Sequence, residues 1–255
     1  MIRLKTLLCA SVLSFTMVNT GGAEPLKHPE KQAWSFKGIF ATYDRAALQR
    51  GFQVWKEVCS TCHALKRIHF RELEALGFTK AQVKALAATY SMKTLNASGE
   101  EVERPGEPSD AFPWIYPNEL AARAANNGAL PGDHSLIIKA RPDGENYLYS
   151  LLIGYNQTPP EGFTIGEGQH YNPYMSGGKI SMAPPFTKDG QVTYSDGTVA
   201  TIDQMAKDLV AFLSWAAEPE SEERREMGIA VMLYLLVMTG VFYLAMRKIW
   251  KDIKG

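Results

Sequence analysis

The stretch VCSTCHAL (residues 58–65) contains two cysteines separated by two residues and a histidine directly after the second cysteine. A thiol pair of this kind can form a disulfide, supply part of a zinc site, act as a redox couple or anchor a cofactor covalently. Each of these uses needs a different setting in the rest of the chain. The surroundings of Cys59, Cys62 and His63 therefore decide what the stretch does.

The first residues of the chain have the pattern of a secretory signal peptide. Two basic residues precede the apolar run LLCASVLSFTMV (7–18), and the small residues TGGA (20–23) follow it. The run is too short to span a bilayer comfortably. We expect cleavage near Ala23, so that residues 1–23 are a signal peptide; a retained membrane anchor is the alternative.

The other end of the chain contains GIAVMLYLLVMTGVFYLAM (228–246), nineteen residues without a charge. This length suits a bilayer-spanning helix of about 20 residues. A buried core helix is the alternative, although such helices are rarely apolar on every face. The tail that follows is rich in Lys and Arg, which places it in the cytoplasm by the positive-inside rule. We therefore expect a signal peptide (1–23), a periplasmic domain (24–226), a transmembrane helix (227–249) and a cytoplasmic tail (250–255).

The exported residues 24–226 contain 21 Lys and Arg and 26 Asp and Glu, a formal charge of −5. This balance gives no sign of nucleic-acid binding and fits a basic soluble partner. Five of the acids form a run that could attract such a partner, but we expect a solvated loop there. The run consists of Glu100, Glu101, Glu103, Glu107 and Asp110.

Two amphipathic helices are expected near the ends of the exported part. DRAALQRGFQVWKEV (44–58) has Asp44 as N-cap, and residues 202–217 follow a T-x-x-Q capping box that begins at Thr201. Gly51 interrupts the first helix, where glycine costs about 1 kcal/mol relative to alanine. A close approach of another helix would explain it, and the two predicted helices could pack on each other. Shorter helices are expected near 71–77, 79–90 and 117–127.

The stretch from Gly154 to Gly190 has a different composition, with seven glycines and five prolines in 37 residues. This is too many for regular secondary structure. Long ordered loops inside compact domains are usually functional. We therefore expect an irregular region here that contributes to the function.

C-x-x-C-H is the attachment pattern of covalently bound haem. Each thiol adds to one vinyl group of the haem, and the imidazole of His63 binds the iron through Nε2. Removal of Cys9 with the signal peptide leaves too few cysteines for a disulfide framework or a structural zinc site. A thioredoxin-like pair should open a helix after a strand, whereas Cys59 and Cys62 end one.

The sixth iron position decides between electron transfer, which needs it closed, and ligand or peroxide chemistry, which needs it open. Met182 lies in SMAPPF, where two prolines limit the freedom of the backbone, and it is favoured modestly over Met175. Met205 falls on the apolar stripe of a helix and is expected in the core. The full set of candidates is His28, His69, His134, His170, Met92, Met175, Met182 and Met205.

A series of stretches in order resembles the cytochrome c1 family, the haem subunit of the quinol–cytochrome c reductase (bc1) complex, in its bacterial form. The stretches are GFQVWKEVCSTCH (51–63), AARAANNGALPGDHSLI (121–137), YLYSLLIGY (147–155), YNPYMSGGKISMAPPF (171–186) and MAKDLVAFLSWAAEPE (205–220). The resemblance implies a mainly α fold: a class I cytochrome c-like haem domain with long Gly/Pro-rich loops and one C-terminal transmembrane helix. It also implies that Met182 is the axial methionine and that Arg123 pairs with a haem propionate.

The function implied by the resemblance is that of a membrane-anchored carrier with one covalently attached haem c. It would pass one electron at a time from the Rieske iron–sulfur protein to a cytochrome c in a respiratory or photosynthetic chain. The chain would be the electron-transfer subunit of the reductase without a substrate site of its own. Cytochrome b, membrane lipid and a dimeric complex are the other expected partners. The expected location is the bacterial inner membrane, with the haem domain in the periplasm.

Two alternatives remain open from the residues alone. One is a free-standing anchored cytochrome c without a complex. The other is a haem enzyme or sensor in which Met182 is absent from the iron and the sixth position is open.

Overall fold

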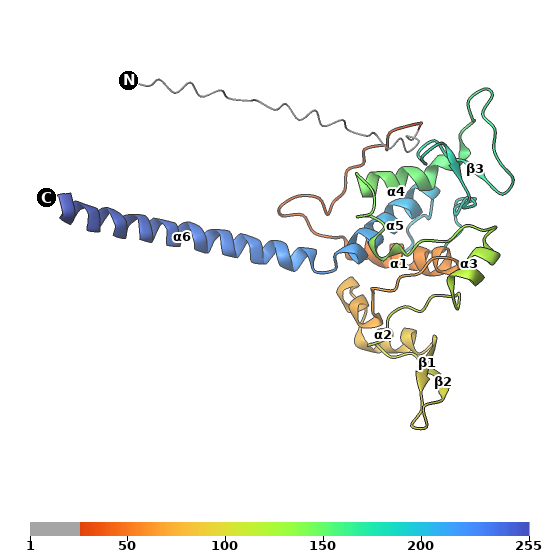
Figure 1. The fold of residues 1–255 in the computed structure, drawn as a ribbon, viewed down its shortest axis with the longest axis horizontal. Helices are drawn as coiled ribbons and strands as arrows, with labels where there is room; N and C mark the ends of the chain where they lie inside the picture. The colour runs from red at the N-terminus through yellow and green to blue at the C-terminus, as the bar shows by residue number, and fades with distance from the viewer. Residues whose placement is uncertain (1–25, 255) are drawn as a thin grey trace, which may run out of the picture.

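The computed structural model describes residues 26–254, so the predicted signal peptide lies outside the described residues. Figure 1 shows a domain of short helices and loops from which one long helix extends. The mainly helical fold with long irregular segments agrees with the fold class expected from the sequence.

The helices α1 (Arg45–Glu57) and α5 (Ile202–Ala217) pack against each other at the centre of the domain (Figure 1). Both begin at the predicted N-caps, Asp44 and Thr201, whose side chains accept hydrogen bonds from backbone N–H groups of the first turn. The apolar stripe of each helix is buried in the common core. The local periodicity of the sequence thus predicted both helices correctly, and the structure shows that they pack against each other.

Gly51 is the point of closest approach between α1 and α5. A Cβ atom on Gly51 would lie 2.0 Å from the backbone oxygen of Asp208 and 2.7 Å from the Cβ of Phe212. Next to it, the buried carboxylate of Asp208 accepts hydrogen bonds from Arg50 at 2.8 and 3.0 Å and from the Gln204 amide at 3.0 Å. Gln204 therefore does not close the predicted capping box, since its side chain turns to Asp208.

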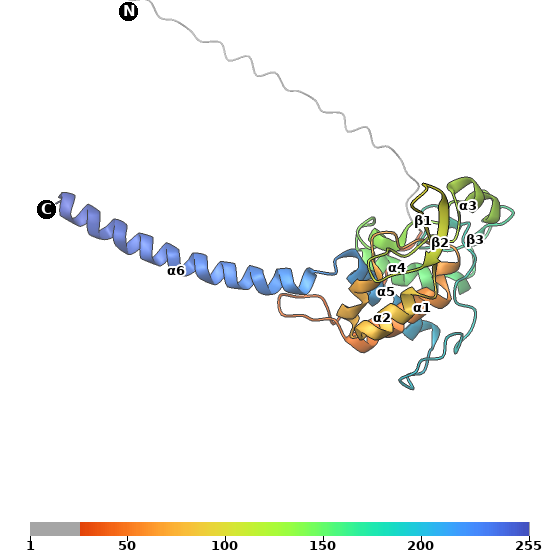
Figure 2. The ribbon, with the colours of Figure 1, turned by 90° about the horizontal axis from the view of Figure 1, so that it is seen from below.

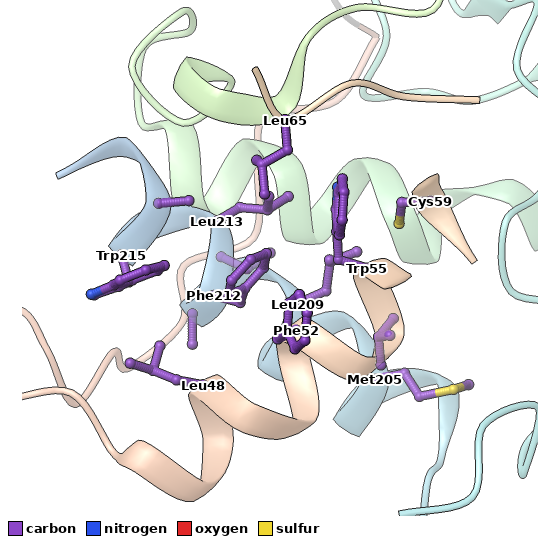
Figure 3. Close-up of a cluster of buried hydrophobic side chains, with 14 of the residues drawn as sticks. Leu48, Phe52, Trp55, Cys59, Leu65, Met205, Leu209, Phe212, Leu213 and Trp215 are labelled. Atoms are coloured by element: carbon purple, nitrogen blue, oxygen red, sulfur yellow. The ribbon is translucent and has the colours of Figure 1, made fainter. Parts of the chain in front are cut away.

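An aromatic cluster fills the space between these helices (Figure 3). The rings of Phe52, Trp55 and Phe212 have centroids 5.6–6.4 Å apart. Burying each such side chain stabilises the fold by about 1.5–3 kcal/mol. Cys59 lies at the edge of this cluster, beyond Trp55 (Figure 3). The core therefore reaches directly to the first cysteine of the C-x-x-C-H stretch.

The three shorter helices lie where the sequence predicts them. The first is a 3-10 helix that ends at Gly77, whose φ of +96° favours glycine. The second begins with a complete capping box at Thr79. Their bounds are η2 (Phe70–Leu76), α2 (Lys80–Ala87) and α3 (Glu119–Ala125).

Helix α4 (Gly144–Ile153) packs on α5 and has no counterpart among the predicted elements. It starts after Asp143, which has a φ of +53° and makes no side-chain cap. The sequence Pro-Asp-Gly before it has the composition of a turn. The helix is held instead by burial of most of its side chains, including Leu148 and Leu152.

The acidic run is mostly exposed, as expected from the sequence, but Glu101 and Glu103 lie in a strand of a β-hairpin and not in a loop. Strand β1 (Ser91–Leu95) pairs antiparallel with β2 (Glu101–Pro105), and Lys93 lies opposite Glu103. Lys93 forms an ion pair with Glu101 at 2.6 Å. The cross-strand partners explain the extended structure, and they are not visible in the acidic run alone.

The Gly/Pro-rich stretch 154–190 is mostly turns and loops, as predicted. It contains one short 3-10 helix, η4 (Gly154–Asn156), and two short strands, β3 (His170–Tyr171) and β4 (Lys179–Ile180), which pair antiparallel. These strands form the base of the turn that carries Met175.

The long helix α6 (Ser221–Lys254) contains the uncharged run 228–246 and is apolar and long enough to cross a membrane. Its apolar window is exposed on all sides, so the alternative of a buried core helix is wrong. The helix begins at Ser221 and so includes charged residues that precede the expected transmembrane segment 227–249. Glu222 and Glu223 lie in its first turn, where acidic side chains favour a helix N-terminus.

Candidate haem site

Helix α1 delivers the C-x-x-C-H stretch at its carboxyl end. The 3-10 turn η1 (Cys59–Thr61) follows at once, and the backbone N–H groups of Cys62 and His63 both donate to the carbonyl of Cys59, at 3.1 and 2.9 Å. Both cysteines are free thiols. Cys59 is buried, and the desolvation raises the pKa of its thiol to about 12. The structure thus brings two unpaired thiols and one imidazole together on a single tight turn.

The imidazole of His63 is fixed by the backbone of a distant loop. Its Nδ1 lies 2.8 Å from the carbonyl oxygen of Gly132. Because a carbonyl can only accept, Nδ1 carries the proton and Nε2 keeps its lone pair for a metal ion. Burial lowers the pKa of His63, while the hydrogen bond to Gly132 opposes this effect. The ring is therefore prepared as a neutral ligand through Nε2.

The segment 114–134 wraps around this turn. Trp114 donates its indole N–H to the carbonyl of Cys62 at 3.0 Å, and the hydroxyl of Tyr116 lies 3.9 Å from the Cys62 sulfur. The backbone N–H of His134 donates to the carbonyl of Ala64 at 2.8 Å. These contacts hold the turn from a segment that is distant along the chain.

His134 is one of the candidates for the sixth iron position, and its placement excludes that role. Its ring stacks on that of His63 with centroids 3.9 Å apart and an interplanar angle of 20°. If both imidazoles bound one metal ion from opposite sides, the ion would lie between them, about 2 Å from each ring nitrogen. The two rings could not then stack face to face. Burial lowers the pKa of His134 well below its ordinary value, so its ring is neutral.

The methionine candidates have different surroundings. Met205 is completely buried on α5, as expected for a core residue. The sulfur of Met175 accepts a hydrogen bond from the hydroxyl of Tyr147 at 3.6 Å. Met182 is half-buried and packs against the core from the Gly/Pro-rich region. Its assignment as the second axial ligand stays a prediction.

Arg123 lies on α3 and is exposed, with its Nη1 donating to the carbonyl of Gly128 at 3.0 Å. The end of the same helix is connected to the cysteines, because the amide of Asn126 donates to the Tyr116 hydroxyl at 3.1 Å. Within the part of the chain that the structure describes, no hydrogen bond joins Arg123 or Met182 to the C-x-x-C-H stretch. The pairing of Arg123 with a propionate also stays a prediction.

A family model described as the Cytochrome C1 family matches residues 34–253. The chain belongs to the cytochrome c1 family. Cytochrome c1 of Rhodospirillum rubrum is 47% identical over 240 residues, which cover 88% of each chain. A mitochondrial cytochrome c1 heme protein of Solanum tuberosum is 47% identical over 225 residues, covering 87% of this chain and 85% of the relative. A protein of Bradyrhizobium diazoefficiens named cytochrome b/c1 is 44% identical over 246 residues, which cover 88% of this chain and 36% of that longer protein.

Membership in the cytochrome c1 family makes the chain a haem protein of electron transport. The donor set of the site fits this group. Among the described residues, no group of three or more His, Cys, Asp or Glu side chains is arranged to hold a metal ion. Haem iron brings its porphyrin nitrogens as ligands, so the imidazole of His63 suits it as a protein ligand. Two free thiols beside that imidazole are what covalent attachment of haem c requires.

Several residues of this cytochrome c1 site were not predicted from the sequence. Gly132 acts through its carbonyl oxygen, which no side-chain pattern reports. Trp114 and Tyr116 lie far from Cys62 along the chain, and only the fold brings them to it. The turn composition of the segment LPGDH (130–134) is the one signal that could have indicated a backbone contact there.

Proposed function

We propose that this chain is the membrane-anchored haem c subunit of a quinol–cytochrome c reductase. In this function it passes one electron at a time from the Rieske iron–sulfur protein to a cytochrome c. The observation that carries the proposal is the fixed imidazole of His63 beside two free thiols, in a chain of the cytochrome c1 family. The chain is a carrier, and the quinol chemistry belongs to other subunits.

Cys59 and Cys62 would hold the haem through two thioethers, with His63 and Met182 as axial ligands and Arg123 near a propionate. Bound in this way, haem c supplies a one-electron iron couple with both axial positions closed. The hydrogen bond from His63 to Gly132 keeps the proton on Nδ1 and orients the ring. A guanidinium beside a carboxylate suits charge-assisted hydrogen bonding, which is the physical basis for the role of Arg123.

The core around the first cysteine supports the exclusion of water from one side of the site. Cys59 is 7% exposed and packs with the aromatic cluster that includes Trp55. An apolar and rigid surrounding limits the reorganisation that accompanies a change of iron charge. The α1–α5 core therefore serves the redox site as well as the stability of the domain.

Two observations support the partners and the location. A relative is named cytochrome b/c1, which agrees with an association between this chain and a cytochrome b. The exposed apolar helix α6 agrees with anchoring in the bacterial inner membrane, with the haem domain in the periplasm and the tail in the cytoplasm. The dimeric state of the complex is part of the same proposal and follows from the family.

The axial ligands are tested with Met182→Leu, with Met175→Leu as the matched control. We expect covalent haem on a denaturing gel in both variants. Only Met182→Leu should lose the weak absorption band near the red end of the oxidised spectrum and show a lower midpoint potential. An unchanged band and potential in Met182→Leu would contradict the ligand assignment and favour an open iron site.

Association with a complex is tested by purification in mild detergent. We expect the chain to co-purify with a b-type cytochrome and a Rieske iron–sulfur subunit. Isolation of the haem-loaded chain without either subunit would favour a free-standing anchored cytochrome c.

A further inference from the structure

The loop that precedes α1, residues 35–43, carries apolar side chains in two opposite settings. Phe36 and Tyr43 at its base are buried, and their rings stack with centroids 4.8 Å apart. Ile39 and Phe40 at its tip are 72% and 85% exposed. Tips of water-exposed loops are normally polar, so two adjacent large apolar side chains at a tip need an explanation.

The shape of the loop is well defined by hydrogen bonds. The backbone N–H of Lys37 donates to the carbonyl of Trp34 at 3.2 Å, and that of Ala41 donates to the carbonyl of Gly38 at 3.4 Å. Gly38 has a φ of +131°, a conformation that favours glycine. The exposed side chains therefore project from a turn whose backbone conformation is defined by hydrogen bonds.

The first turns of α6 hold this loop in place. Arg225 donates through Nη1 to the carbonyls of Phe36 and Gly38, at 3.1 and 3.0 Å. Glu222 accepts a hydrogen bond from the backbone N–H of Tyr43 at 2.7 Å. Figures 1 and 2 both show the loop, in red-brown, beside the beginning of α6.

These contacts place the tip close to the start of the apolar part of α6. The uncharged run begins at Gly228, three residues after Arg225, which is a rise of about 4.5 Å along the helix axis. A group that contacts the Arg225 guanidinium therefore lies near the level at which α6 would enter the bilayer. Ile39 and Phe40 extend the apolar surface of α6 sideways at that level.

We infer that Ile39 and Phe40 insert into the outer interfacial layer of the lipid bilayer and form a second membrane contact beside α6. The contact rests on apolar burial, because the first turns of α6 carry more acidic than basic residues and would not attract anionic lipid. Two points of contact, the helix and the loop, limit the tilt of the haem domain on the membrane. The inference rests on the membrane anchoring that is part of the proposed function.

The test uses the full haem-loaded chain in phosphatidylcholine vesicles, with an environment-sensitive NBD fluorophore on Phe40→Cys. Cys59 and Cys62 are expected to be blocked by haem, and the chain without an added cysteine controls for this. The matched control is Val199→Cys, since Val199 is 74% exposed but lies before α5, at the end of that helix distant from α6. A label at Val237→Cys, within the apolar part of α6, reports the anchor itself.

We expect the label at position 40 to emit at shorter wavelength than the label at 199. It should be quenched by nitroxide-bearing lipids, and quenched several-fold less by iodide in the water than the label at 199. Equal behaviour of the two labels, with the label at 237 in lipid, would overturn the loop contact and leave the anchor intact. Shielding of position 40 from both quenchers would overturn it in favour of a protein contact. A label at 237 in water would overturn the anchor and the loop contact together.

Discussion

The α1–α5 helix pair and the β1–β2 hairpin use the same two devices in different surroundings. Each contains a glycine with a structural role, and each has an arginine that binds an aspartate through two nitrogens. In the helix pair, Gly51 meets the backbone of Asp208, whose side chain is 2% exposed. In the hairpin, a Cβ on Gly99 would meet nothing within 4 Å, and the side chain of Asp110, the partner of Arg104, is 14% exposed.

The comparison shows that the loss of folding free energy on changing a residue depends more on the surroundings of that residue than on its type. A glycine between two packed helices leaves no room for a methyl group. A glycine in an exposed turn restricts only the backbone dihedral angle. A buried carboxylate that loses its partner cannot be compensated by water, whereas an exposed one can.

The largest effect is expected for Gly51→Ala. The new Cβ would clash with backbone atoms of α5, so α1 and α5 must separate, at a cost of about 3 kcal/mol or more. Because α1 continues into Cys59, we also expect less covalent haem per chain. Thermal unfolding in detergent measures the loss of stability, and a haem-stained gel measures the loss of haem.

The matched control is Gly99→Ala, at a φ of +81°. This change should cost only about 1 kcal/mol and leave the haem content unchanged. Equal losses in the two variants would contradict the comparison.

The next effect concerns the two arginine–aspartate pairs. Asp208→Asn removes the buried charge partner of Arg50, which keeps its ion pair with the more exposed Asp196 at 2.7 Å, and should lower the free energy of unfolding by about 2 kcal/mol. Asp110→Asn in the hairpin should lower it by about 1 kcal/mol or less. Denaturant unfolding of wild type and the two variants under identical conditions gives the ratio of the two losses of unfolding free energy. A larger loss for the hairpin variant would show that burial does not rank these pairs.

The smallest effect is the acid dependence of the hairpin pair. The Arg104 guanidinium holds the pKa of Asp110 at about 2, below its ordinary value of 3.8. Since the pKa is lower in the folded state, the pair stabilises the fold above the unfolded-state pKa, and the stabilisation is lost as the pH falls through about 2. We expect wild type and Asp110→Asn to differ in Tm at pH 6 and to converge on acidification. A constant difference down to pH 2 would contradict the role of this ion pair.

The sequence predicted those parts of the fold and the site that depend on near neighbours. The N-caps at Asp44 and Thr201, the apolar stripes behind them and the C-x-x-C-H spacing are all readable within a few turns of chain. Gly51 inside a helical pattern indicated a close approach of another helix, and the structure shows that this helix is α5. The uncharged run of α6 needed only its length and composition.

The parts that were not predicted depend on distant partners. Helix α4 follows a turn-like Pro-Asp-Gly and is stabilised by burial against α5. Glu101 and Glu103 of the acidic run lie in a strand because β1 pairs with β2. At the site, the tautomer of His63 depends on the carbonyl of Gly132, and the exclusion of His134 from the sixth position depends on how the two rings stack.

The sequence by itself determined the C-x-x-C-H pattern, with its two thiols and adjacent imidazole, and the apolar C-terminal helix, because each is a local pattern of residue types. Only the tertiary structure decided which nitrogen of His63 keeps a free lone pair and where the loop tip at Ile39 and Phe40 lies relative to α6. Both depend on backbone carbonyls from remote segments, and a backbone carbonyl is present at every residue. Its partner is therefore set by the fold alone.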